Sequence, residues 1–254
     1  MLLRIGDKSF DAGLVIFDKD GTIVDIKNTW ARVAESWLEK LLKNTGKKVL
    51  SSELYRSIGY NQNKHKIDEH GPLATATVEE LRIIAATLLY KHGFSWNQAR
   101  DLSSDSFKEV TESVSFADLV CPITDVRGLM RNLHEAGVRL AVITTDDREE
   151  TVKTITLLNI QDSVDFLVCG DDPVPVKPAP EAVLEACNHT GVEPVRTAVV
   201  GDTVVDMLMA KNAGAGFRIG VLSGAGSRES LAPHADVLIE SIEEIRIESA
   251  IKHI

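Results

Sequence analysis

The chain has 254 residues, of which 44% are hydrophobic and 26% charged, and a net charge of −10 at pH 7. This length and composition are typical of a folded globular protein with one large domain, or with a core that carries an insert. The acidic balance argues against nucleic acid or an anionic membrane as a partner, because both require a basic surface. A small-molecule partner fits the composition better.

The sequence shows no pattern typical of membrane insertion or export. No apolar run approaches the roughly 20 residues that span a bilayer. The segment MLLRIGDKSF lacks the apolar stretch and the cleavage site of an export signal, so we expect a cytoplasmic protein. Cys121, Cys169 and Cys187 lie far apart and match neither a disulfide framework nor a metal-binding spacing. We predict that all three are buried or half-buried thiols.

The first predicted strand covers residues 13–17, and its apolar run begins at Leu14. A helical region follows this strand. Residues 26–118 contain no convincing strand but several amphipathic patterns. The clearest has an apolar stripe on Trp30, Val33, Ala34, Trp37, Leu38, Leu41 and Leu42. A second pattern runs from Val78 to Leu88, and a third covers about 96–113. We interpret residues 26–118 as a helical insert.

The remaining sequence alternates strand-like and helical patterns. Further strands are predicted at 139–143, 166–169, 197–200 and 217–221, with an edge strand at 236–239. Val126 begins a helical pattern that Gly137 is placed to end, and another pattern follows Val205. This alternation predicts an α/β fold with a doubly wound, mostly parallel sheet covered by helices on both faces. The core would comprise residues 1–25 and 119–254.

Polar groups follow four of these predicted elements. In a parallel sheet such groups meet at the carboxyl ends of the strands. They are Asp18, Lys19, Asp20, Gly21, Thr22, Thr144, Thr145, Lys177, Gly201, Asp202, Thr203 and Asp206. Two carboxylates about 5 Å apart repel by roughly 3 kcal/mol at an effective dielectric of about 20. A cation must offset this repulsion, and we expect Mg²⁺ bound by carboxylate oxygens, with Lys177 as the remaining positive charge.

Four stretches of the sequence resemble the motifs of the haloacid dehalogenase-like hydrolases, most of which are phosphatases. They are DKDGTIVD, the strand that ends at Thr144, Lys177 in KPAPE, and GDTVVD, in the family's order. The helical insert resembles the α-helical cap of the branch that includes the phosphoglycolate phosphatases. The resemblance covers the whole chain and implies a Rossmann-like core with a cap inserted after its first strand.

The resemblance also implies roles for individual residues. Asp18 would attack phosphorus to form an aspartyl phosphate, and Asp20 would act as general acid and then general base. Thr144 and Lys177 would hold the phosphoryl oxygens. The metal would be held by Asp18, the backbone carbonyl of Asp20, Asp202 and Asp206, the last binding it or orienting its ligands. The implied substrate is a small phosphorylated metabolite.

Gly21, Thr22 and Thr145 are further candidates for substrate binding. Many relatives of this branch carry Asn at the position of Thr145. The neighbouring Asp146, Asp147 and Arg148 either face the substrate or form the polar start of a helix. A stretch within the insert, 56–66, carries Arg56, Lys64, His65 and Lys66 without an acid. We predict that Arg56, Lys64 and Lys66 contact a polar or anionic leaving group, the alternative being a solvated basic loop.

The acidic motifs also allow other interpretations, some of which the sequence excludes. Each motif alone is compatible with a capped turn. An EF-hand fails, because Gly21 at the sixth loop position would place Ile16 at the first. A sugar phosphomutase of the same family shares every motif and remains an alternative. A receiver module places its acidic pair ahead of the phosphorylated Asp and lacks a helical insert, and a catalytically silent binding protein of this fold would be expected to lose Asp18 or Asp20. A non-catalytic phospho-acceptor or binding module is a further alternative. The sequence leaves the oligomeric state open.

Overall fold

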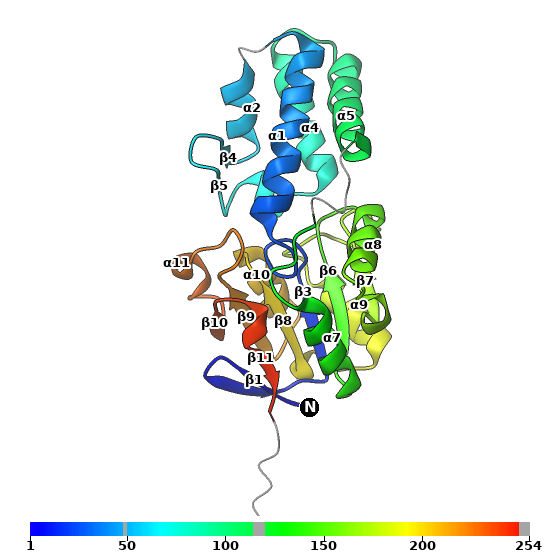
Figure 1. Cartoon of the computed structure of the whole chain (residues 1–254), viewed down its shortest axis with the longest axis vertical. Helices are drawn as coiled ribbons and strands as arrows, with labels where there is room; N and C mark the ends of the chain where they lie inside the picture. Colours follow the sequence, from blue (N-terminus) through cyan, green and yellow to red (C-terminus); the bar gives the residue numbers. More distant parts are fainter. Residues whose placement is uncertain (48–49, 114–119, 249–254) are drawn as a thin grey trace, which may run out of the picture.

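The computed structural model describes residues 1–47, 50–113 and 120–248. It places a group of helices beyond one end of a parallel sheet (Figure 1). The first strands lie at the opposite end of the molecule from these helices. The boundary predicted at 118/119 lies outside the described residues.

The central sheet has six parallel strands in the order β10-β9-β8-β3-β6-β7. These are β3 (Leu14–Phe17), β6 (Arg139–Ile143), β7 (Phe166–Val168), β8 (Thr197–Gly201), β9 (Phe217–Val221) and β10 (Val237–Ile239). Every predicted strand is present to within a residue or so at its ends, and the strand at 236–239 is an edge strand as expected. The predicted α/β fold is therefore confirmed.

Helices cover both faces of this sheet. They are α7 (Val126–Glu135), α8 (Arg148–Leu157), α9 (Glu181–Thr190), α10 (Val204–Asn212) and α11 (Arg228–Leu231), with short 3₁₀ turns η2 (Gln161–Ser163), η3 (Pro194–Arg196) and η4 (Ile242–Glu244). Along β3, Leu14 and Ile16 pack with α9 and α10, whereas Val15 and Phe17 pack with α7 and α8. Successive side chains of a strand point to opposite faces, so an uninterrupted apolar run marks a strand buried on both sides.

The helical segment, from α1 to α5, has its own apolar cluster. Its helices are α1 (Ile26–Thr45), α2 (Ser51–Ser57), α3 (Pro72–Thr75), α4 (Val78–Lys91) and α5 (Trp96–Ser113). The three longest match the three predicted patterns. Trp37 is buried at the centre of the cluster, where it packs edge-on against Phe107 and its indole N–H donates to the Ser103 carbonyl oxygen at 3.1 Å.

The expectation that residues 26–118 contain no strand is wrong. A short antiparallel pair, β4 (Tyr60–Asn61) and β5 (Lys66–Ile67), follows α2. Its register pairs the buried Tyr60 with the buried Ile67 and leaves the other pair exposed. Two-residue strands are too short to show the alternation that identifies a strand in a sequence.

A second small sheet was also not predicted. It has the order β11-β1-β2, with β1 (Leu2–Ile5), β2 (Lys8–Asp11) and β11 (Ile245–Ile247), all antiparallel. Leu3 and Ile5 of β1 are fully buried in the same cluster as α7, while their neighbours are exposed. This sheet therefore covers part of one face of the central sheet.

One prediction about the cysteines needs correction. Cys169 and Cys187 are buried, as expected, but Cys121 is exposed. Cys121 lies where the chain returns from the helical segment, and its carbonyl oxygen accepts a hydrogen bond from the N–H of Asp25. The backbone of this crossing is thus held in place while the thiol faces solvent.

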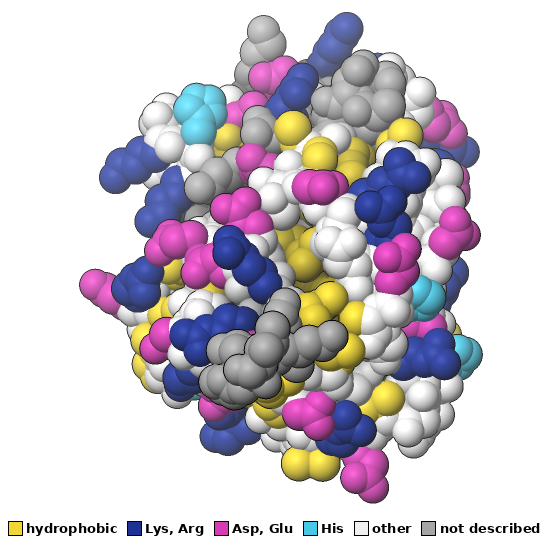
Figure 2. Space-filling view, turned by 60° about the horizontal axis from the view of Figure 1, so that its bottom comes forward, with side chains coloured by type: hydrophobic (Ala, Val, Ile, Leu, Met, Phe, Trp, Pro, Cys, Tyr) yellow, Lys and Arg dark blue, Asp and Glu magenta, His cyan; other side chains and the backbone are white. Residues whose placement is uncertain are grey.

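The surface is mixed in charge on the side opposite the helical segment. In Figure 2, Lys and Arg side chains lie among Asp and Glu side chains on this face. Within the described residues, no helix combines the length and the apolar character needed to cross a bilayer.

Glu69 connects the helical segment to the core. Its carboxylate accepts hydrogen bonds from the Ser227 N–H at 2.6 Å and from the Ser230 hydroxyl at 2.5 Å. Burial opposes ionisation of Glu69, but the hydrogen bonds from Ser230 and Ser227 prevail and lower its pKa. Glu69 is therefore a charged acceptor that holds the two parts against each other.

We predict that Trp37→Ala destabilises the protein by about 3–5 kcal/mol, because it opens a large cavity in the helical segment. Denaturant unfolding measures the loss, and hydrogen exchange should accelerate in α1 and α5 more than in β3 and β8. The control is Trp96→Ala, which removes a tryptophan that is 40% exposed. Equal effects of the two substitutions would contradict the burial of Trp37 at the centre of the cluster.

Candidate active site

The acidic motifs meet at the carboxyl end of the central sheet. Asp18 and Asp20 follow β3, and Asp202 follows the neighbouring strand β8. From β3 the chain fills one side of the sheet with β6 and β7, then returns to fill the other side with β8, β9 and β10. Ligands of open α/β sheets bind at such a reversal of strand order.

Three carboxylates and one ammonium group form the centre of the site. Carboxylate oxygens of Asp18, Asp202 and Asp206 lie within 4.8 Å of one another. The Lys177 Nζ lies 2.5 Å from Asp18 Oδ1 and 2.6 Å from Asp206 Oδ1. Lys177 comes from the segment between β7 and α9 and is buried. The structure thus brings together four residues predicted from separate parts of the sequence.

Burial and neighbouring negative charges shift the pKa values of this site. Burial raises the pKa of Asp18 to about 7, although the Lys177 ammonium opposes the shift. The pKa of Asp202 is raised well above its ordinary value by burial and by the charges of Asp18 and Asp206. Burial alone would lower the pKa of Lys177, but Asp18 and Asp206 outweigh it and raise that pKa. Such a site favours a bound proton or a bound cation.

The three acids differ in how many of their carboxylate oxygens accept hydrogen bonds. Both oxygens of Asp206 are engaged: Oδ1 by Lys177, and Oδ2 by the N–H and hydroxyl of Thr203 at 3.1 and 2.6 Å. Asp202 Oδ2 accepts the N–H of Ala225 at 2.7 Å. Among the described hydrogen bonds, none engages Asp18 Oδ2 or Asp202 Oδ1. Asp18 and Asp202 therefore offer oxygens to a hard cation, while Asp206 orients Lys177.

Gly21 allows the loop after β3 to pack against Asp202. Its φ is +88°, and a Cβ there would lie 2.3 Å from Asp202 Oδ2 and 2.9 Å from the Gly224 Cα. The hydroxyl of Thr22 is buried without a hydrogen-bond partner among the described residues. Neither Gly21 nor Thr22 is among the residues that line the cavity at Asp18.

Thr144 and Thr145 lie beside Asp18 at the end of β6. The Thr144 N–H donates to the Val168 carbonyl oxygen at 3.0 Å, which fixes the backbone. The Thr144 hydroxyl accepts the N–H of Asp146 at 3.1 Å and keeps its own proton for another acceptor. Both threonines line one cavity with Asp18 and Asp20.

This cavity is small and has two different walls. Its volume is about 30 Å³, which is enough for about one water molecule. The core contributes the polar wall, and the helical segment contributes an apolar one made by Ile26, Trp30, Leu73, Ala74, Ala76, Val78 and Leu81. Trp30, predicted to belong to the core of the helical segment, packs on that cluster and also lines this cavity.

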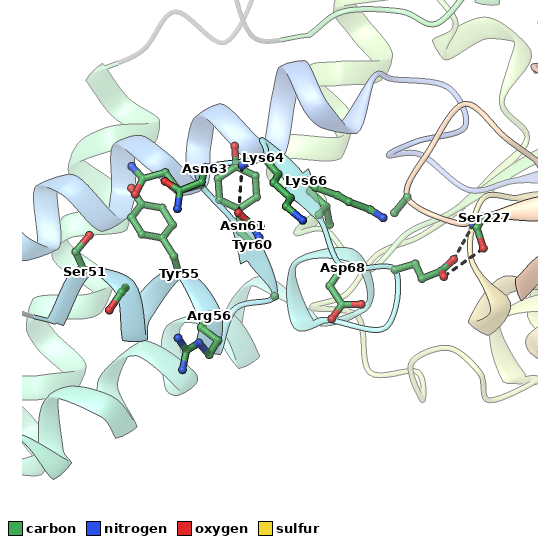
Figure 3. Close-up of a pocket in the computed structure, with 16 residues that line it drawn as sticks. Ser51, Tyr55, Arg56, Tyr60, Asn61, Asn63, Lys64, Lys66, Asp68 and Ser227 are labelled. Atoms are coloured by element: carbon green, nitrogen blue, oxygen red, sulfur yellow. Dashed lines mark hydrogen bonds between the residues drawn. The ribbon is translucent and has the colours of Figure 1, made fainter.

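The basic residues predicted to bind substrate line a different pocket. Arg56, Lys64 and Lys66 border a pocket of about 800 Å³ that shares no lining residue with the cavity at Asp18 among the described residues. Lys64 and Lys66 extend toward the core segment that carries Ser227, whereas Arg56 is directed away from them (Figure 3). Lys64 and Lys66 therefore lie near the junction between the helical segment and the core.

Sequence reasoning missed the partners of Lys19. Its buried Nζ lies 2.6 Å from Asp20 Oδ2 and 3.0 Å from Asp146 Oδ2. Burial raises the pKa of Asp146 to about 6, although the Lys19 ammonium group acts to lower it. The sequence did contain a signal for these contacts: Lys19 lies between two acids at the end of a buried strand, and a buried ammonium group requires a partner. Arg148, by contrast, pairs with Asp172.

The comparisons with known proteins agree with this geometry. The family model described as haloacid dehalogenase-like hydrolase matches residues 13–214, which include all the acids of the site. A solved structure described as a "predicted phosphoglycolate phosphatase" from Haemophilus somnus superposes with a TM-score of 0.70, covering 91% of this chain and 95% of that one. At 19% identity this likeness supports the fold alone.

Two curated relatives are similar in sequence. Validoxylamine A 7′-phosphate phosphatase from Streptomyces hygroscopicus subsp. limoneus is 28% identical over 236 residues, 92% of this chain and 95% of that protein. Pyrophosphatase PpaX from Halalkalibacterium halodurans is 40% identical over 96 residues. This second match spans 38% of this chain and less than half, 45%, of that protein.

We predict that Asp202→Asn raises the melting temperature of the metal-free protein, and raises it more at pH 8 than at pH 5.5. A carboxylate whose pKa is raised on folding contributes stability below its unfolded pKa and loses it as the pH rises through the folded pKa. The amide removes that loss and can still accept the Ala225 N–H. Each kcal/mol gained corresponds to roughly 2–4 °C in a protein of this size.

The measurement is thermal unfolding in EDTA and in MgCl₂ at both pH values. Mg²⁺ should stabilise the wild type and should have little effect on Asp202→Asn. Asp101→Asn, at an exposed position of α5, is the control. A Mg²⁺ effect that survives in Asp202→Asn would show that the cation binds elsewhere.

Proposed function

This chain belongs to the haloacid dehalogenase-like hydrolases, and we propose that it is a Mg²⁺-dependent phosphatase that hydrolyses a small phosphate monoester through an aspartyl phosphate. The proposal rests on one observation: the candidate nucleophile and the candidate general acid line the same cavity. Asp18 is held by Lys177 beside two further acids, and Asp20 lines the same cavity.

Asp18 would be the nucleophile. Lys177 contacts its Oδ1. Of the two Asp18 oxygens, one would face the cation and the other would attack phosphorus. The new bond forms between this oxygen and phosphorus as the bond from phosphorus to the leaving oxygen breaks. Thr144 and Lys177 would stabilise the charge on the transferred phosphoryl oxygens, because Thr144 lines the cavity and the Lys177 ammonium contacts Asp18.

Asp20 would be the general acid and base. It would give a proton to the leaving alcohol, then take one from the water that attacks the aspartyl phosphate. That second attack releases inorganic phosphate and regenerates the Asp18 carboxylate. The two acids lie in the same cavity but differ in their partners, since Asp18 contacts Lys177 and Asp20 contacts Lys19.

Asp18, Asp202 and the backbone carbonyl oxygen of Asp20 would hold Mg²⁺, with Asp206 as the orienting acid. None of the described backbone hydrogen bonds ends at the Asp20 carbonyl oxygen. An all-oxygen set with excess negative charge suits a hard divalent cation. When bound, Mg²⁺ would neutralise charge on the phosphoryl group and lower the pKa of Asp18.

Residues 26–118 would act as a cap over the catalytic core, which we assign to 1–25 and 119–254. The helical segment already supplies the apolar wall of the cavity at Asp18. A cap that closes in this way excludes water from the phosphoryl transfer. The separate apolar cluster of the helical segment supports its treatment as a unit of its own.

We propose a small phosphorylated metabolite as substrate, with phosphoglycolate as the first ester to test. A similar protein of nearly equal length is named Validoxylamine A 7′-phosphate phosphatase, and a protein from Neisseria meningitidis that is 25% identical over 91% of this chain is named phosphoglycolate phosphatase. Gly21, Thr22 and Thr145 remain proposed contacts of the phosphate end. Lys64 and Lys66, together with Arg56, remain proposed contacts of an anionic leaving group.

We expect the purified protein to hydrolyse p-nitrophenyl phosphate only with Mg²⁺ or a similar ion. Asp18→Asn should lower kcat by about 10⁴-fold or more, because the nucleophile is lost. Asp162→Asn, which changes an exposed acid, is the matched control. Activity that persists in EDTA, or in Asp18→Asn, would disprove the proposed mechanism.

The same assay on natural esters distinguishes hydrolysis from the mutase alternative. Release of one inorganic phosphate per ester consumed identifies a phosphatase. Conversion of a sugar phosphate into its isomer, without release of phosphate, identifies a phosphomutase.

We further predict that Lys64→Ala with Lys66→Ala raises KM for an anionic ester such as phosphoglycolate by roughly fivefold per lysine, since an exposed ion pair is worth up to about 1 kcal/mol. The KM for p-nitrophenyl phosphate should change little, because that ester has no second anionic group. Lys91→Ala, an exposed lysine of α4, is the control. If both esters respond alike, the basic loop does not determine selectivity.

A further inference from the structure

A second set of buried charges lies beside the proposed catalytic acids. Lys19 connects Asp20, its neighbour in the chain, to Asp146, which follows β6. Lys19 and Asp146 are only 2% and 6% exposed. Burial of an ammonium group is costly without partners, so these contacts hold all three side chains in one arrangement.

Asp146 is itself fixed at three points. Its N–H donates to the Thr144 hydroxyl at 3.1 Å, its Oδ1 accepts the N–H of Asp147 at 3.0 Å, and its Oδ2 contacts Lys19. A continuous series of contacts therefore runs from Thr144 through Asp146 and Lys19 to Asp20. It joins the loop after β3 to the loop after β6.

The two oxygens of Asp20 differ in a way that points to function. Oδ2 contacts Lys19, whereas Oδ1 is buried and has no hydrogen-bond partner among the described residues. Buried polar atoms nearly always have a partner, so an unpaired one calls for an explanation. Asp20 lines the cavity that also contains Asp18. The unpaired oxygen is therefore the one available to a substrate.

We propose that Lys19 and Asp146 are positioning residues that hold the Asp20 carboxyl group by Oδ2 so that Oδ1 exchanges the proton with the leaving group. The inference rests on the proposed phosphatase function. As the bond from phosphorus to the leaving oxygen breaks, the proton on Oδ1 passes to that oxygen. Attack by water on the aspartyl phosphate later returns a proton to Oδ1.

The test compares esters with poor and good leaving groups. Glycerol 2-phosphate needs a proton on its alkoxide, whereas p-nitrophenyl phosphate does not. The ratio of their kcat/KM values reports the steps up to departure of the leaving group. For Lys19→Met and Asp146→Asn, we expect kcat/KM to fall about 100-fold with glycerol 2-phosphate and less than about fivefold with p-nitrophenyl phosphate, given the usual contribution of general acids.

Three further variants make the result specific. Asp20→Asn should show the same selective loss to a greater extent. Lys19→Arg should restore most activity toward glycerol 2-phosphate, because it keeps the charge between the two acids. Arg218→Met breaks the ion pair between Arg218 and Asp236, which lies outside the site, and should leave the ratio unchanged.

The outcomes separate the two proposals. Equal losses with both esters, or no loss in Asp146→Asn, would overturn the positioning role. If Lys19→Met does not fold, Asp146→Asn and Lys19→Arg decide the question, with thermal unfolding as the check on structure. A wild type that hydrolyses neither ester, or an active Asp18→Asn, would instead overturn the phosphatase function itself.

Discussion

Three clustered carboxylates, of which Asp202 and Asp206 are buried and Asp18 is half-buried, face one buried ammonium group, and the candidate site depends on this imbalance. Lys177 reaches Asp18 and Asp206 but does not compensate for Asp202, whose pKa is raised well above its ordinary value. The Ala225 N–H donates to Asp202 and partly stabilises its carboxylate, yet a deficit of positive charge persists. Such a site favours a bound proton or a hard cation, so the proposed affinity for Mg²⁺ and the expected loss of stability without it would have one physical cause.

Much of this arrangement could be predicted from the sequence, because it follows from local patterns and one rule of topology. The run LVIF in β3 is apolar at every position, as a strand buried on both faces requires. The acids directly after β3 and β8 had to converge once the sheet was parallel, since parallel strands end at one edge. The helices α1, α4 and α5 were visible from their apolar spacing.

The remaining features depend on contacts between distant residues. Neither the partnership of Lys19 with Asp146 nor the hydrogen bonds of Glu69 follows from a local pattern, because each joins segments far apart in the chain. The strands β4 and β5 are too short to have a period. The exposure of Cys121 depends on how the chain crosses back to the core. A sequence identifies which groups are polar, but only the fold determines their partners.

The size of the cavity at Asp18, about 30 Å³, has a consequence for how tightly any ester can bind. On the proposed function, a phosphate ester is far larger than one water molecule, so it would enter only molecules in which the helical segment has moved away from the core. The observed affinity is then the intrinsic affinity multiplied by the fraction of molecules that are open. The hydrogen bonds from Ser227 and Ser230 to Glu69 help to set that fraction. A residue outside the cavity at Asp18 would thus take part in setting the dissociation constant of the ester.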